Sequence, residues 1–178
     1  DEAEQPELLH LSGMDVRRAA KMLGRTQDDL HDGLALPNNN ASCEFLYPQE
    51  TATLLARGAT PPYFVGLNLW DSAARIAPLT VAAGAKQVLA FENSFPDNLA
   101  ELFFSSFYER LAKADWNSLD AFVHGIAATR PYARRVRGSG FVLWSDESLL
   151  EHHLQLQTPF DSKTISPNKI SPVALRPI

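Results

Sequence analysis

Residues 64–91, FVGLNLWDSAARIAPLTVAAGAKQVLAF, have the pattern of a complete strand, loop, helix and strand. Residues 64–69 and 88–91 are short apolar runs, which are typical of buried parallel strands. Between them, Pro78 suits the first turn of a helix, and Gly84 suits the position after its last turn. The stretch therefore predicts a βαβ crossover, the unit from which parallel sheets are built.

The loop after the first of these strands is the expected place for chemistry. In open α/β sheets, ligands and reacting groups lie at the carboxyl ends of the strands. Trp70, Asp71 and Ser72 follow the strand at 64–69 directly. These three residues are therefore the first candidates for a functional site.

The segments before this unit predict further short elements. Residues 8–11 read as a strand that contains His10, and the apolar spacing over residues 15–23 predicts a helix. A polar surface excursion over residues 24–40 contains one candidate short strand at 33–36. Residues 48–56 predict a helix with Leu54 and Leu55 turned inward.

The segments after the unit predict two long helices and a closing strand. A capping-box-like start at Ser94 opens a helix that runs to Lys113, and a second helix covers residues 118–129. The first has a core stripe at four-residue spacing, and the second has one apolar face with His124 off it. Residues 138–144 predict the last strand. The stripe is Leu99, Phe103, Phe107 and Leu111, and the apolar face is Leu119, Phe122, Val123 and Ile126.

Three short motifs occur in order along the chain: LNLWDSA at 67–73, AAGAK at 82–86 and FYERL at 107–111. Together they resemble the CHAT family, a branch of the caspase-like peptidases, over about residues 8–146. The resemblance implies an α/β fold, a three-layer sandwich with a mainly parallel central sheet. It also implies a caspase-like domain over residues 1–150 that lacks some N-terminal strands. The four prolines after residue 158 exclude a regular helix, so residues 151–178 are expected to form an extended, proline-rich tail.

The expected lack of upstream strands has a structural consequence. The strands at residues 8–11 and from Val65 should lie near the centre of a sheet of at most about five strands. The edge beside residues 8–11 should then be open, or covered by a partner, another copy or the tail.

The chain departs from the family at the two positions that perform its chemistry. Trp70 stands where family members have the catalytic Cys, and Met14 stands where they have the catalytic His. An indole and a thioether cannot act as a nucleophile and a base. The resemblance therefore implies a non-catalytic scaffold, regulatory or protein-interaction module, with His10, Asp71 and Ser72 as neighbours of the degenerate pair. Met14 and Trp70 are expected to touch at adjacent strand ends.

An enzyme is the competing interpretation. Ser72 or Cys43 would be the nucleophile of a hydrolase, but no G-x-S-x-G motif surrounds Ser72. Cys43 is expected in a polar loop, and a lone cysteine commonly behaves as a small apolar residue. Neither residue has a histidine recognisably placed to serve it.

A third interpretation rests on the arginine segment, residues 130–137, which contains Arg130, Arg134, Arg135 and Arg137. Such a cluster can bind phosphates or an acidic protein, so a nucleic-acid or nucleotide sensor is a further alternative. A solvated loop explains the cluster equally well. The net charge of −5, from 21 acidic and 16 basic residues, argues against nucleic-acid binding by bulk charge.

The composition sets the remaining expectations. The chain has 178 residues, of which 45% are hydrophobic, and it contains a single cysteine. No stretch is long and apolar enough for a membrane span, and the acidic start is unlike that of a signal peptide. A lone cysteine fits a protein of the reducing cytoplasm. Metal binding is not expected, because the five histidines, His10, His31, His124, His152 and His153, show no metal-binding spacing. No cofactor is expected either, since the sequence has no glycine-rich phosphate loop or dinucleotide fingerprint. The expected partners are proteins or neighbouring domains.

Overall fold

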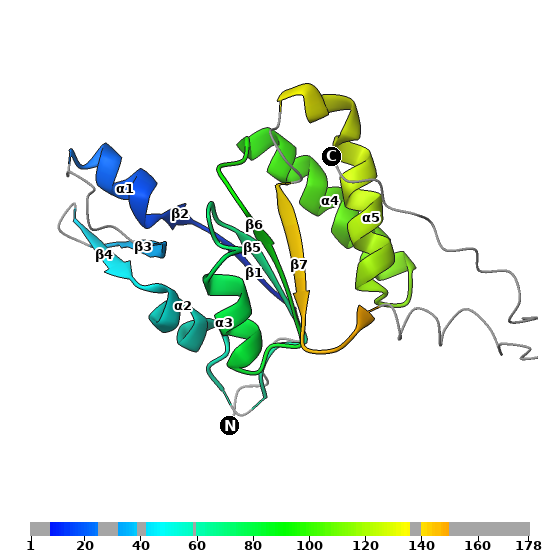
Figure 1. Cartoon of the computed structure of the whole chain (residues 1–178), viewed down its shortest axis with the longest axis horizontal. Coiled ribbons are helices and arrows are strands. Elements are labelled where there is room, and N and C mark those ends of the chain that lie inside the picture. The colour runs from blue at the N-terminus through cyan, green and yellow to red at the C-terminus, as the bar shows by residue number, and fades with distance from the viewer. Residues whose placement is uncertain (1–7, 25–31, 39–41, 59, 136–139, 150–178) are drawn as a thin grey trace, which may run out of the picture.

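The computed structural model describes residues 8–24, 32–38, 42–58, 60–135 and 140–149, which form two β-sheets (Figure 1). The larger sheet has the strand order β1-β5-β6-β7. β1, β5 and β6 run parallel, and β7 pairs antiparallel with β6. The fold is therefore mixed α/β with a mainly parallel sheet, as the sequence predicts. The four strands are β1 (Leu8–Ser12), β5 (Phe64–Asn68), β6 (Gln87–Phe91) and β7 (Phe141–Ser145).

The predicted βαβ unit is confirmed. Helix α3 (Ile76–Ala82) connects β5 to β6 and has Pro78 in its first turn. Gly84 follows the last turn with a φ of +121°, a conformation that glycine adopts without a steric penalty. A Cβ at this position would also lie 2.7 Å from the ring of Pro61. Both residues thus have the structural roles that the sequence predicts.

The smaller sheet is antiparallel and has the order β2-β3-β4. It contains β2 (Met14–Asp15), β3 (Leu34–Pro37) and β4 (Cys43–Leu46). β3 confirms the short strand predicted at residues 33–36. The prediction of a polar loop at Cys43 was wrong, because Cys43 begins β4 and pairs with Pro37. Four residues are too few for an alternating pattern to be recognised after the asparagine run that precedes them.

The other predicted helices are present, with differences at their ends. They are α1 (Val16–Met22), α2 (Pro48–Leu55), α4 (Asp97–Lys113), α5 (Ser118–Thr129) and the short 3-10 helix η1 (Arg130–Arg135). The predicted capping box at Ser94 was wrong, because α4 begins at Asp97 and Pro96 is its N-cap. α1 has a side-chain cap instead: the Asp15 carboxylate accepts a hydrogen bond of 2.9 Å from the Arg18 N–H.

Helices cover both faces of the larger sheet, α4 and α5 on one side and α3 on the other (Figure 1). The α4 side buries an aromatic core, and the other side buries aliphatic residues such as Val65, Leu67 and Ile76. The predicted α4 stripe is buried, and a Cβ at Gly125 of α5 would lie 2.8 Å from the Phe103 ring. The aromatic core comprises Phe64, Phe91, Phe95, Phe103, Phe104, Phe107 and Phe141.

Two predicted core residues lie on the surface instead. Leu54 of α2 is 48% exposed, and Val123 of α5 is 58% exposed. Both belong to apolar patterns, but α5 turns Ala121 and Gly125 toward the core, since small residues allow it to approach α4 closely. Leu55 alone of the predicted α2 pair is buried.

β1 is an edge strand of the larger sheet in the described part of the chain, rather than a central one as expected. Residues 1–7 and 150–178 lie outside the described residues, and with them the predicted tail. Among the described helices, none has both the length and the apolar character needed to cross a membrane.

Candidate functional site

The carboxyl ends of β1 and β5 meet at one edge of the larger sheet. Ser12 pairs with Asn68, and the Asn68 amide donates a hydrogen bond of 3.1 Å to the Ser12 hydroxyl. The N–H of Gly13 donates to the Asn68 carbonyl at 3.3 Å. Met14 and Trp70 follow two residues later, and both line a pocket of about 350 Å³. The two residues thus border the same pocket, and the expected contact between Met14 and Trp70 stays a prediction.

Trp70 is held on two sides. Its indole Nε1 donates a hydrogen bond of 2.9 Å to the carbonyl of Phe95, in the segment that leads into α4. The guanidinium of Arg18 lies over its ring, 4.5 Å from the centroid. Arg18 also forms an ion pair of 3.7 Å with Asp97 at the start of α4. The pocket is therefore bordered by an indole that is fixed by a carbonyl and a cation.

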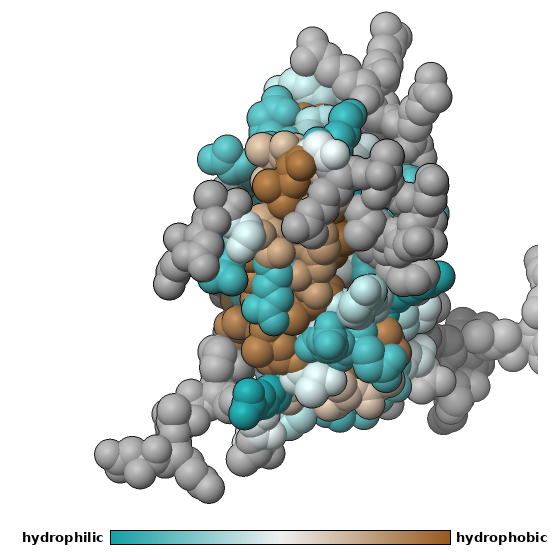
Figure 2. Space-filling view, turned by 90° about the vertical axis from the view of Figure 1, so that its left-hand side faces the viewer, coloured by the Kyte–Doolittle hydropathy of each residue, from teal (hydrophilic) through white to brown (hydrophobic). Residues whose placement is uncertain are grey.

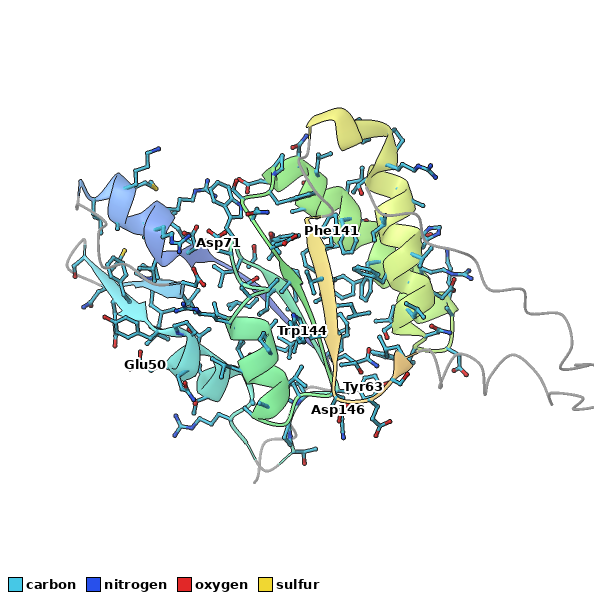
Figure 3. The ribbon with its side chains drawn as sticks, viewed as in Figure 1. Glu50, Tyr63, Asp71, Phe141, Trp144 and Asp146 are labelled. Carbon is cyan, nitrogen blue, oxygen red and sulfur yellow. The ribbon has the colours of Figure 1, made fainter. Side chains whose placement is uncertain are left out.

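A cluster of acidic and basic side chains around Asp71, which is labelled in Figure 3, adjoins this pocket. Asp71 has a φ of +55°, which is uncommon for a residue other than glycine, and its carboxylate lies 3.7 Å from Arg17. Arg17 also pairs with Asp32 at 3.0 Å. Burial raises the pKa of Asp71, Arg17 opposes this shift, and the negative charges of Asp15 and Asp32 add to it. The site thus holds a carboxylate that is less acidic than usual.

Ser72 is a structural residue of this loop. Its side chain is fully buried, and its hydroxyl donates a hydrogen bond of 2.7 Å to the Leu69 carbonyl. The same oxygen accepts one of 3.2 Å from the Phe91 N–H at the end of β6. Trp144 of β7 fixes the next residue, since its Nε1 donates to the Ala73 carbonyl at 2.9 Å (Figure 3). The loop after β5 is thereby bonded to β6 and β7.

His10 points to a different part of the molecule. Its Nδ1 lies 2.7 Å from the Tyr108 hydroxyl of α4, and its ring is edge-on to Phe104 at 4.6 Å. Burial lowers the pKa of His10 and raises that of Tyr108. His10 therefore contacts α4, and it is not among the described residues that line the pocket at the end of β1.

Two of the other sequence candidates, Cys43 and Arg130, are described by the structure and do not line this pocket. Cys43 is half-buried on β4 and lines neither pocket at the strand ends. Arg130 is exposed at the end of α5, and the backbone of Arg134 and Arg135 belongs to η1. Arg137, His31, His152 and His153 lie outside the described residues.

The sequence did not predict several residues of the site, among them Asp15, Arg18 and Asp97. Asp15 precedes a helical pattern, and an N-cap signal of this kind would have placed its carboxylate beside the third residue that follows. Asp97 follows β6 by several residues, and no local pattern brings it to Arg18. That contact depends on the packing of α4 against the sheet.

The lining of the strand-end pocket limits its chemistry. Its described lining residues are Ser12, Gly13, Met14, Arg18, Asn68, Trp70 and Asp97, none of which is a cysteine or histidine. No group of three potential metal ligands occurs in the part of the chain that the structure describes. Such a lining can bind a ligand through charge and aromatic contact.

Comparison of the sequence with protein-family models and with curated proteins found no match.

Proposed function

We propose that this chain is a non-catalytic, CHAT-like pseudo-peptidase domain of caspase-like fold, which acts as a scaffold, regulatory or protein-interaction module. The observation that supports this proposal is Trp70 at the end of β5, where the resemblance places a catalytic Cys. Its indole is bonded to the Phe95 carbonyl and covered by Arg18. Met14, in the position of the catalytic His, lines the same pocket. A thiolate with an activating imidazole therefore has no counterpart at these positions.

The hydrolase alternative gains no support from the geometry of its candidate nucleophiles. The Ser72 hydroxyl is buried and takes part in two backbone hydrogen bonds, whereas a nucleophile must reach its substrate. Cys43 lies on β4 and outside the pocket lining. Capture of Ser72 by a fluorophosphonate, or rapid labelling of Cys43 at about pH 6, would favour this alternative over the proposal.

The partner in this proposal is a protein or a neighbouring domain of a longer chain, in the reducing cytoplasm. The net charge of −5 and the lone cysteine support these two choices. Binding of RNA or DNA at about 50 mM salt, weakening steeply as salt rises, would instead favour a nucleic-acid sensor that uses residues 130–137.

Introducing a His at position 14 and a Cys at position 70 tests whether these positions correspond to the catalytic residues of the family. In a C43S background, W70C introduces a single thiol, and M14H adds an imidazole beside it. We expect the pKa of the introduced thiol to be lower in W70C/M14H than in W70C alone, because a nearby imidazolium stabilises the thiolate. The measurement is the rate of iodoacetamide alkylation as a function of pH.

The matched control is W70C/M22H in the same background. Met22 is 71% exposed on α1 and lines neither strand-end pocket, so M22H should leave the thiol titration unchanged. The same thiol pKa in W70C, W70C/M14H and W70C/M22H would refute the idea that positions 14 and 70 correspond to the catalytic His and Cys of the family. Turnover of any peptide substrate by the wild-type chain would refute the non-catalytic assignment itself.

A further inference from the structure

The outer face of α2 carries a regular stripe of exposed side chains. Glu50, Thr53, Leu54 and Arg57 are spaced by three and four residues, so they lie along one side of the helix and the turn that follows it. All four are exposed, and Leu54 is 48% exposed. Tyr47, at the start of α2, is 55% exposed. The stripe thus presents apolar atoms to the surface near its middle and at one end.

The same residues border a shallow groove of about 450 Å³. Figure 2 shows the face of the molecule that carries α1, α2 and β4, where apolar residues are exposed beside polar ones. Figure 3 shows Glu50 on the side of α2 that is turned away from the larger sheet. Exposed apolar surface rimmed by polar residues is typical of an interaction site. The groove is lined by Leu46, Gln49, Glu50, Thr53, Leu54 and Arg57.

The charges on this stripe are arranged to complement a second copy of themselves. Glu50 lies near the start of α2, and Arg57 lies two residues after its end, roughly 10 Å along the helix direction. Thr53 and Leu54 lie midway between them. If two copies of α2 pack antiparallel about a two-fold axis at this midpoint, each Glu50 faces the Arg57 of the other copy. The apolar centre, Leu54, then meets its own counterpart.

We propose that the chain forms a two-fold symmetric dimer through the outer face of α2. A two-fold interface uses one patch twice, so that patch must complement itself in charge and in shape. An acidic end, an apolar middle and a basic end meet this requirement in the antiparallel orientation. The proposal is independent of the resemblance to peptidases, since it rests on α2 and not on the ends of β1 and β5.

Self-association can be measured directly on the 178-residue chain. Sedimentation velocity between about 5 and about 500 µM should show a concentration-dependent shift from monomer to dimer. A chain that stays monomeric at the highest concentration would overturn the proposal and leave this groove to a partner of another kind.

Charge reversal then tests the antiparallel geometry. E50R and R57E each place like charges opposite one another in the dimer, so each variant alone should raise the dissociation constant at least about tenfold. An equimolar mixture of the two variants restores both opposite-charge pairs, and it should dimerise as the wild type does. Failure of the mixture to dimerise would overturn the proposed arrangement.

The mixture also separates an interface effect from a folding effect. Glu50 accepts a hydrogen bond of 2.8 Å from the Tyr47 N–H, so E50R weakens the start of α2 in addition to its surface charge. A misfolded E50R chain would not be rescued by R57E. The matched control is E101R, which reverses an exposed charge on α4 and should leave the dimer intact. A loss of the dimer in E101R equal to that in E50R would contradict the assignment to α2.

Discussion

The space between the larger sheet and α4 contains seven phenylalanines that are each at most 5% exposed, whereas the pocket at the ends of β1 and β5 is lined by charged and half-buried side chains. Burial of one phenylalanine stabilises a fold by about 1.5–3 kcal/mol, and an exposed ion pair by about 0–1 kcal/mol. The stability of the fold therefore depends mainly on the aromatic core. The strand-end pocket can therefore change its residues with little loss of stability.

The largest expected effect concerns Phe103. Its ring stacks on Phe141 with centroids 3.8 Å apart and is fully buried. F103A should lower the free energy of unfolding by about 3–5 kcal/mol, because it removes a large side chain and leaves a cavity. Urea unfolding followed by circular dichroism measures the loss. F122A is the control: Phe122 is only half-buried, so a loss as large as that of F103A would mean that depth in the core is not the cause.

A smaller effect is expected at the link between the pocket loop and β6. S72A removes the hydroxyl that bonds to the Leu69 carbonyl and to the Phe91 N–H, and should cost about 1–3 kcal/mol of stability. The control is S105A, at an exposed position on α4, which should change stability by no more than about 0.5 kcal/mol. Unchanged thermal unfolding in S72A would mean that these hydrogen bonds do not hold the loop.

The contact between Arg18 and Trp70 should be weaker still. A double-mutant cycle of R18M and W70L is expected to give a coupling energy of about 0.5–1 kcal/mol, the range for a partly exposed cation–π pair. D97N, which removes the other partner of Arg18, should alter stability less than R18M does, since Asp97 is 75% exposed. Zero coupling would show that the stack is not formed in solution.

The smallest effect is a pH dependence at Asp71. Its pKa is raised by burial, so the folded state retains a proton that the unfolded state releases, and stability falls as the pH rises from about 3.8 through the folded pKa. D71N removes this titration and keeps a residue that tolerates positive φ. The stability of D71N relative to wild type should therefore increase over this pH range. A stability difference between D71N and wild type that does not change with pH would contradict the raised pKa of Asp71.

Long periodic segments were predicted well from the sequence. The βαβ unit and the α4 stripe combine many residues whose apolar spacing agrees with one structure. β4 and the start of α4 were predicted wrongly, because each depends on a few residues whose local signal is weak. Leu54 and Val123 were assigned to the core from spacing alone, and spacing does not say which of several apolar positions will meet a neighbouring element.

For the candidate site, the sequence predicted the strand-end location of Trp70, Asp71 and Ser72, because the end of a strand is a local property. It did not predict that Ser72 would bond to β6 or that Arg18 would cover Trp70. Ser72 and Phe91 are separated by 19 residues, and their contact depends on the parallel pairing of β5 with β6.

Backbone preferences and side-chain periodicity act over a few neighbouring positions, so the βαβ order, the apolar strands and the residues at their ends could be predicted from the sequence alone. Which of these residues come into contact depends on how the strands and helices pack together. Sheet pairing placed Met14 beside the pocket of Trp70, and the packing of α4 brought Asp97 to Arg18. These contacts join segments far apart along the chain, and they form because burial of the aromatic core fixes the sheet and its helices relative to one another.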